Sequence, residues 1–305
     1  VKLNEIDVQV VKEIGTGANL FDNGDLDYTV LADTYALQYK ESKQAHFVPK
    51  AMVGYLSPNH RREITGNEHV RKAFLQAIDK ETFAKEILGD GSTALNGFVP
   101  ANFAKNPDTG EDFRKENGDL LPYNIKEAQA NWTKAKEELG KDKIELELIS
   151  ADSAIAKKTI EFVQGQLQQN LPGLTIKLKS LPLQNRLDLQ TAGNYDLAFG
   201  TWTPDYADPI NFLEFYDSKS GLNTSGYNDS AYDAGLQKVR KDYANEPEKR
   251  WNELLSLEKT LIEKDAGVLP LFQGAIGYLK SDRLQGLQVF SFGRTVSYRL
   301  AYVEE

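Results

Sequence analysis

The residues best suited to chemistry lie in one short loop, Thr201–Ala207. The loop carries the indole of Trp202 and, three residues later, the carboxylate of Asp205. A carboxylate binds positively charged groups and an aromatic ring covers apolar ones, so the pair indicates a ligand site. The alternative is an ordinary surface corner between a strand and a helix, with Trp202 half-buried. Composition alone favours that simpler interpretation.

The flanks of this loop predict how it is held. Before it, Tyr195, Leu197 and Phe199 alternate with polar or small residues, as in a strand that ends at Trp202. After it, Asp208 can cap a helix and Pro209 suits the first helical position. The loop therefore joins the carboxyl end of a strand to the amino end of a helix.

The preceding residues predict the sheet to which this strand belongs. Along this part of the chain, the spacing of apolar residues is alternately that of a strand and that of a helix. The predicted order is a strand at Ile144–Leu148, a helix at Ile155–Leu171, a strand at Ile176–Leu178, a helix at Leu183–Ala192 and the strand Tyr195–Trp202. This order is typical of a parallel sheet with right-handed crossovers, and hence of an α/β fold. Ligands of such sheets bind beyond the carboxyl ends of the strands, where Trp202, Thr203 and Asp205 fall.

Further helices and strands are predicted on both sides of this core. Helices are expected at Thr16–Asp25, Asn67–Asp79, Thr82–Leu88, Ile125–Leu139 and Ser230–Tyr243, and after a capping box at Asn245–Glu248. In the helix Asn67–Asp79, the expected solvent-facing residues are Arg71, Lys72, Gln76 and Lys80. Strands are expected at Leu3–Val10, Val48–Leu56, Val268–Phe272 and Ile276–Leu279, the last two split by Gly274, with two more within Leu287–Val303. The segment Gly89–Tyr123 is expected to be a long surface loop.

Composition narrows the possible functions. The chain has 305 residues, of which 40% are apolar and 27% charged, as in an ordinary globular protein. Its net charge of −9 disfavours nucleic acid as a partner but not a cationic or zwitterionic ligand. The absence of cysteine excludes disulfides and zinc–thiolate sites. No signal peptide or membrane span is evident, and the start at Val1 is expected of a chain cut from something longer or processed.

Motifs for catalysis or metal binding are weak. His60 and His69 bound the stretch HRREITGNEH, but their spacing matches no zinc pattern, and both are expected to be solvated. There is no phosphate-binding glycine loop and no nucleophile elbow. Asp205 and Asp208 could serve as the carboxylate pair of a glycosidase, although a chance pair is the better explanation.

Several segments, taken together and in order, resemble one family. They are VGYLSPN, NEHVRKAFLQAIDKETFAKEILGDGSTALNGFVP, GNYDLAFGTW, GTWTPDYADPINFL, SGYNDSAYDAGL and DAGVLPLFQ. This set is similar to the family 5 extracellular solute-binding proteins, the receptors of oligopeptide ABC transporters. The resemblance implies a periplasmic-binding-protein-like type II lobe, with a mixed sheet and flanking helices.

The resemblance also implies a domain organisation. Family members have two lobes and about twice this length. Residues 1–285 would be the second, carboxyl-terminal ligand-binding lobe, and residues 286–305 a returning tail that packs on the missing amino-terminal lobe. A signal peptide and a lipid anchor would lie outside this chain and would be its sole membrane contact. The expected location is the extracellular face of the bacterial cell membrane or the periplasm.

The function implied by the resemblance is peptide capture without catalysis. An oligopeptide would be enclosed between the lobes and delivered to the permease subunits. Asp205 would bind its α-ammonium group and Trp202 would wall the first side-chain pocket, while Gly200, Thr201 and Thr203 would offer backbone groups. No cofactor or metal is implied. The alternatives are a receptor of the same fold for a sugar, nickel chelate or haem, and an acidic-residue hydrolase.

Overall fold

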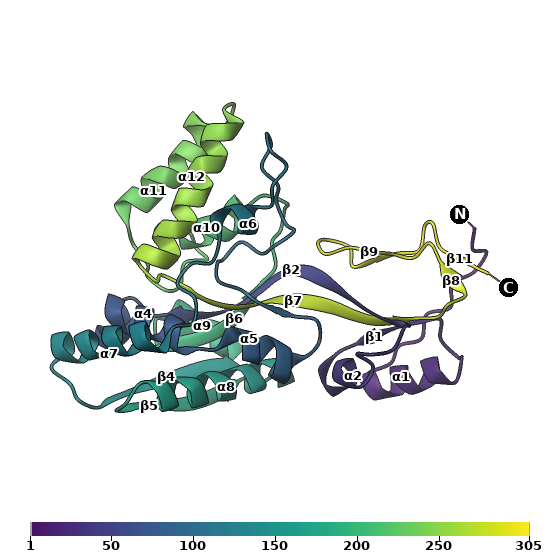
Figure 1. The fold of residues 1–305 in the computed structure, drawn as a ribbon, viewed down its shortest axis with the longest axis horizontal. Coiled ribbons are helices and arrows are strands. Elements are labelled where there is room, and N and C mark those ends of the chain that lie inside the picture. Colours follow the sequence, from purple (N-terminus) through teal and green to yellow (C-terminus); the bar gives the residue numbers. More distant parts are fainter. Residues whose placement is uncertain (1, 305) are drawn as a thin grey trace. The chain divides into compact units, whose positions relative to one another are not determined.

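The computed structural model describes residues 2–304, which form two compact units (Figure 1). The first comprises the residues up to Met52, Glu81–Thr93 and the residues from Gln273 onward. The second comprises Val53–Lys80 and Ala94–Phe272. Strands β2 (Ala45–Pro58) and β7 (Leu269–Lys280) contribute residues to both units. Among residues 2–304, no helix is both long and apolar enough to cross a lipid bilayer.

The sheet of the second unit is built as the sequence predicts. Its successive elements are β4 (Ile144–Ala151), α8 (Ala154–Asn170), β5 (Leu174–Leu181), α9 (Leu183–Thr191) and β6 (Leu197–Trp202). Strand β4 pairs in parallel with β5 along its whole length, and with β6 at Leu148↔Leu197 and Ile149↔Ala198. The predicted α/β core is therefore confirmed.

An antiparallel strand makes this sheet mixed. Strand β2 pairs with β6 from Val53↔Trp202 to Pro58↔Leu197, and the strand order in the second unit is β7-β2-β6-β4-β5. The fold expectation of a mixed sheet with flanking helices is therefore correct. Because β6 lies between β2 and β4, both neighbours fix its direction and hence the position of the loop that follows it.

Helices cover the sheet through apolar stripes. Helix α8 buries Ile160, Val163 and Leu167. Helix α4 (Glu68–Ala77) packs on α7 (Ile125–Leu139), where the rings of Phe74 and Trp132 lie 6.0 Å apart. Asparagine side chains cap both helices, because Asn67 accepts a hydrogen bond from Val70 N and Asn124 from Glu127 N.

A second group of helices follows the candidate loop (Figure 1). It contains α10 (Ile210–Leu213), α11 (Ser230–Gln237) and α12 (Pro247–Lys259), and a π-helical turn extends each of the last two, at Lys238–Asp242 and Thr260–Lys264. Pro247 opens α12 as expected, but the predicted capping box is wrong. The N-cap is Glu246, which makes no side-chain capping bond.

The segment Gly89–Tyr123 is not a surface loop. It contains β3 (Thr93–Ala94) and α6 (Phe113–Asn117) and buries apolar side chains, namely Phe98, Val99, Phe113 and Leu120. In the second unit, the carboxylate of Glu258 holds this segment against α12. Its oxygens accept hydrogen bonds from Phe98 N at 2.7 Å, Val99 N at 2.8 Å and Arg114 Nη1 at 2.7 Å. Asn117 Nδ2 adds a fourth bond at 2.5 Å.

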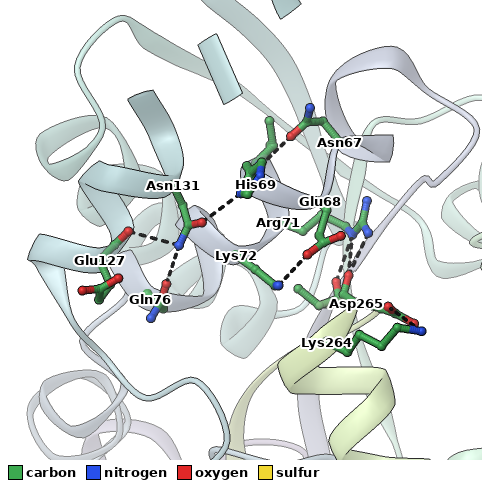
Figure 2. Close-up of polar contacts among 12 residues, drawn as sticks. Asn67, Glu68, His69, Arg71, Lys72, Gln76, Glu127, Asn131, Lys264 and Asp265 are labelled. Carbon is green, nitrogen blue, oxygen red and sulfur yellow. Dashed lines mark hydrogen bonds and ion pairs between the residues drawn. The ribbon is translucent and has the colours of Figure 1, made fainter. Parts of the chain in front are cut away.

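The polar face predicted for α4 is also mostly wrong. Arg71, Gln76 and Lys80 are buried. The guanidinium of Arg71 donates to the carbonyl oxygen of Asp265 (Figure 2). It also donates to the carbonyl oxygens of Ala266, Thr65 and Gly66, so four backbone acceptors replace water. Lys80 Nζ donates to Asn96 Oδ1 at 2.6 Å. Lys72 keeps the expected partly exposed position and pairs with Glu68.

The first unit departs from the prediction most clearly near its amino-terminal end. The residues expected to form a strand at Leu3–Val10 form no regular element, and Val8 and Val10 are 72% and 93% exposed. The elements of this unit include α1 (Ile14–Asp22), β1 (Tyr28–Leu31) and α2 (Asp33–Gln38). Strand β1 pairs with β7, which continues through Gly274 without the expected break. Beyond it lie two short antiparallel pairs, β8 (Leu284–Gln285) with β11 (Tyr302–Val303) and β9 (Gln288–Val289) with β10 (Val296–Ser297).

Neither histidine of the second unit is simply solvated. The ring of His60 packs edge-on against Tyr227 at 5.4 Å, and its Nε2 donates to the carbonyl oxygen of Gly267 at 2.9 Å. Burial, together with the positive charge of Arg71, lowers the pKa of His60 to about 4. His69 Nδ1 bonds to the side-chain oxygen of Asn131 at 3.0 Å (Figure 2).

Replacing Glu258 with glutamine is expected to destabilise the second unit. The amide removes the charge opposite Arg114 and turns one acceptor into a donor, so the free energy of unfolding should fall by about 3 kcal/mol. Urea denaturation of both proteins measures this difference. The matched control is Glu263→Gln, an exposed carboxylate that should change stability by less than about 0.5 kcal/mol. A loss for Glu258→Gln no larger than that of the control would contradict the role given to this carboxylate.

His60 is expected to make stability depend on pH. Its pKa is about 4 in the folded protein and about 6.5 when unfolded, so the unfolded chain binds the extra proton between these values. This contribution to stability should therefore be fully present above pH 6.5 and fall by about 3 kcal/mol as the pH drops to 4. In His60→Gln, which retains a donor for Gly267, unfolding curves measured across this range should show a shallower loss. Parallel curves for the two proteins would rule out this effect.

Candidate functional site

Trp202 ends strand β6, where the sequence places it. Its ring is half-buried and meets the ring of Phe215 edge-on, with centroids 5.1 Å apart. The indole Nε1 is buried and has no hydrogen-bond partner within residues 2–304. One face of the candidate loop thus carries an aromatic wall with an unused donor.

Asp205 lies in the exposed part of the loop. Its backbone N–H donates to the side-chain oxygen of Asn211 at 2.9 Å, which fixes the turn, and Pro204 beside it is buried. Its carboxylate makes no hydrogen bond or ion pair with any residue that the structure describes. This carboxylate is therefore available to a ligand.

Asp208, by contrast, is occupied by structural contacts. Its Oδ1 accepts a hydrogen bond from Ile210 N at 3.0 Å, and its other oxygen pairs with Arg250 at 2.9 Å. Asp208 thus bonds the first N–H group of the helix, as the sequence suggests, but the N-cap residue is Pro209 and the helix begins at Ile210, so Pro209 does not hold the expected first helical position. The two aspartates thus have different environments, which does not favour a catalytic carboxylate pair.

The backbone beside the loop forms a partly open strand edge. The pairing of β6 with β4 ends at Ala198, whereas its pairing with β2 continues to Trp202. Among the described strands, Gly200 and Thr201 therefore have a partner on one side alone. An open edge of this kind can accept the backbone of an extended ligand. Thr201 and Thr203 are exposed, and Gly200 is buried.

Sequence analysis missed the side chains on the buried face of β6. Gly200 lies opposite Tyr55 of β2, and Arg186 of α9 reaches over the same position. A Cβ atom on Gly200 would lie 3.0 Å from Arg186 Nη2 and 3.4 Å from the Tyr55 hydroxyl oxygen. Burial lowers the pKa of Arg186 and raises that of Tyr55 to about 12. A lone arginine in a short helix gives no sequence signal for such a position.

The described residues offer no metal centre. No cluster of three or more histidine, cysteine, aspartate or glutamate side chains within residues 2–304 has a geometry that could hold a metal ion. His69 is engaged on both sides, by Asn131 and by Glu138 at 3.4 Å.

Comparison with known proteins identifies the family. The sequence profile of the bacterial extracellular solute-binding proteins, family 5 Middle, matches residues 1–224. The dipeptide-binding protein of Lactococcus lactis is 30% identical over 316 residues, which cover 100% of this chain and 57% of that protein. The dipeptide-binding protein DppE of Bacillus subtilis is 28% identical over 288 residues, which cover 94% of this chain and 52% of that protein.

Solved structures agree with this result and support the expected periplasmic-binding-protein-like fold. Listeria monocytogenes OppA bound to peptide has 37% identity and a TM-score of 0.83, and the match covers 97% of this chain and 57% of that one. The substrate-binding domain of an oligopeptide ABC transporter from Bacillus anthracis has 34% identity and a TM-score of 0.86, with coverages of 100% and 60%. The chain therefore spans little more than half the length of these relatives.

The family profile covers well over half of the chain, and the fold and the resemblance of the motifs agree with it. The chain belongs to the bacterial extracellular solute-binding proteins, family 5.

Proposed function

We propose that this chain is the second lobe of the substrate-binding component of a peptide ABC importer. The observation that carries the proposal is the carboxylate of Asp205, which is exposed, unpaired and placed beside Trp202 at the open end of β6. Support comes from relatives described as a dipeptide-binding protein and as OppA bound to peptide. The expected ligand is an oligopeptide with a free amino terminus.

Asp205 supplies the charge for this ligand. An ammonium group donates charge-assisted hydrogen bonds to a carboxylate, and these strengthen when water is excluded. Since Asp205 has no partner in the described chain, binding an ammonium does not require breaking an existing ion pair. The turn held by Asn211 limits the loop motion that must be frozen on binding.

The rest of the site orients the ligand without selecting its sequence. Gly200, Thr201 and Thr203 offer backbone groups to an extended peptide, and Trp202 walls the first side-chain pocket. Hydrogen bonds to a peptide backbone give affinity that is largely independent of side chains. In this role the protein binds and releases its ligand and performs no catalysis.

The domain arrangement is part of the same proposal. Residues 1–285 form the second lobe, and residues 286–305 pack on an amino-terminal lobe that completes the enclosure. Permease subunits receive the ligand, at the extracellular face of the cell membrane or in the periplasm. A lipid anchor outside this chain attaches the receptor to the membrane.

Substitution of Asp205 is expected to abolish ligand retention. Native mass spectrometry of the two-lobed protein, purified without refolding, should detect bound masses that fragment as peptides. Asp205→Ala should lose them, because the ammonium group no longer has a counter-charge. The matched control is Asp242→Asn, an exposed carboxylate in the helical group, which should retain the peptides. Peptides still bound to Asp205→Ala, or one discrete non-peptide mass in the wild type, would contradict the proposal.

The chain alone is expected to bind peptides weakly. It presents one wall of the site, so a bound peptide would remain in contact with water and gain little affinity. Titration calorimetry of this 305-residue chain with tripeptides should give affinities weaker than millimolar. Tighter binding would mean that enclosure by a second lobe is not needed.

A further inference from the structure

Arg186 is a buried cation without an acidic partner among the residues that the structure describes. Its side chain projects from α9 and the residue is 9% exposed. Within residues 2–304 its guanidinium makes one hydrogen bond, from Nη2 to the side-chain oxygen of Gln190, and its Nε is buried without an acceptor. Burying a charge without compensation is costly, so such a group calls for an explanation.

The charges of the other buried arginines of the second unit are compensated more fully, although Nε and Nη2 of Arg114 are also buried without an acceptor in the described chain. Arg71 donates to four backbone carbonyl groups. Arg114 pairs with the carboxylate of Glu258. Arg186 Nη2 and the hydroxyl oxygen of Tyr55 both lie within 3.4 Å of the position that a Cβ atom on Gly200 would occupy, and neither Tyr55 nor Gly200 carries a negative charge.

The position of Arg186 links it to the candidate site. Its Nη2 lies 3.0 Å from the point where a side chain on Gly200 would begin. Gly200 and Trp202 are two residues apart in β6, so they face the same side of the sheet. On this side the indole Nε1 of Trp202 is a second buried donor without an acceptor in the described chain.

The missing partner must therefore be an acceptor. Arginine Nε and tryptophan Nε1 can donate hydrogen bonds but cannot accept them. A carboxylate satisfies both requirements of the guanidinium, since it accepts hydrogen bonds and neutralises the charge. Asp205, three residues beyond Trp202, provides the opposite charge for an ammonium group.

We propose that Arg186 is a second ligand-binding residue, which binds a carboxylate of the captured peptide beside Gly200. The proposal rests on the proposed function and adds a preference to it. The site then favours zwitterionic ligands, with Asp205 and Arg186 binding groups of opposite sign. The carboxylate can come from an acidic side chain or from the peptide's own carboxyl terminus.

The test measures binding of matched peptides to the two-lobed protein by titration calorimetry. Ala-Ala-Ala with a free and with an amidated carboxyl terminus probes the terminal carboxylate. Amidated Ala-Glu-Ala and Ala-Gln-Ala probe the side chain. The wild type should prefer the carboxylate in at least one pair by tenfold or more, and the pair that shows it identifies the source.

Arg186→Gln should reduce this preference to less than twofold and leave the affinity for amidated Ala-Ala-Ala within twofold of the wild type. That retained binding also shows that the variant is folded. Arg186→Lys, which keeps the charge, should retain part of the preference. Lys134→Gln removes an exposed cation from α7 and should have no effect.

The outcomes separate the two proposals. A preference that survives in Arg186→Gln, or a wild type without any preference, overturns the role of Arg186 while the peptide-binding function stands. Loss of the amidated peptide in Asp205→Asn together with its retention in Arg186→Gln supports both roles. If the wild type binds none of the four peptides, the proposed function is wrong and the role of Arg186 falls with it.

Discussion

The unequal pairing of strand β6 is the constraint on which the candidate site depends. Strand β2 holds β6 as far as Trp202, but β4 releases it after Ala198. Pairing with β2 makes the end of β6 rigid. Because pairing with β4 stops earlier, the other edge of β6 has no partner there in the described chain. A rigid edge with unused backbone groups is what an extended ligand needs, because hydrogen bonds to a fixed partner cost less ordering than bonds to a mobile loop. Trp202 and Asp205 acquire their positions from this strand end.

Buried charges hold the surroundings of the sheet in place. Glu258 accepts hydrogen bonds from the segment Gly89–Tyr123, and Arg71 donates hydrogen bonds to backbone carbonyl groups around Asp265. Each ion joins segments far apart in the sequence, and each is satisfied by several groups at once. Such contacts add specificity as much as stability, since an alternative packing would leave a charge unsolvated. Arg186 is built into the same unit but has no acidic partner among residues 2–304.

The sequence was sufficient to predict the local structure around the candidate loop. The elements from β4 to β6 could be predicted because the apolar pattern of each element is complete within that element. The positions of Trp202 and Asp205 at the end of β6 followed from the same pattern, whereas their roles in binding remain a prediction. The failures share a physical cause. The burial of Arg71 and His60 depends on carbonyl groups almost 200 residues or more away in sequence. The segment Gly89–Tyr123 is rich in turn-forming residues, yet a single distant carboxylate orders part of it. Residues Leu3–Val10 have a strand-like pattern, but a strand also requires a neighbour, which no local pattern can supply.

Gly200 restricts how the specificity of this site could change during evolution. A side chain at position 200 would press against the guanidinium of Arg186, whose Nη2 lies 3.0 Å from the Cβ position. The two positions are therefore coupled: a methyl group at position 200 requires the guanidinium to shift by a few tenths of an ångström, and a bulkier side chain requires a larger displacement of the arginine. Arg186 can be replaced first, since a smaller residue at position 186 creates no clash with Gly200. A lineage that abandons the cation would then be free to fill the vacated volume, and recovery of the original arrangement would require both positions to revert.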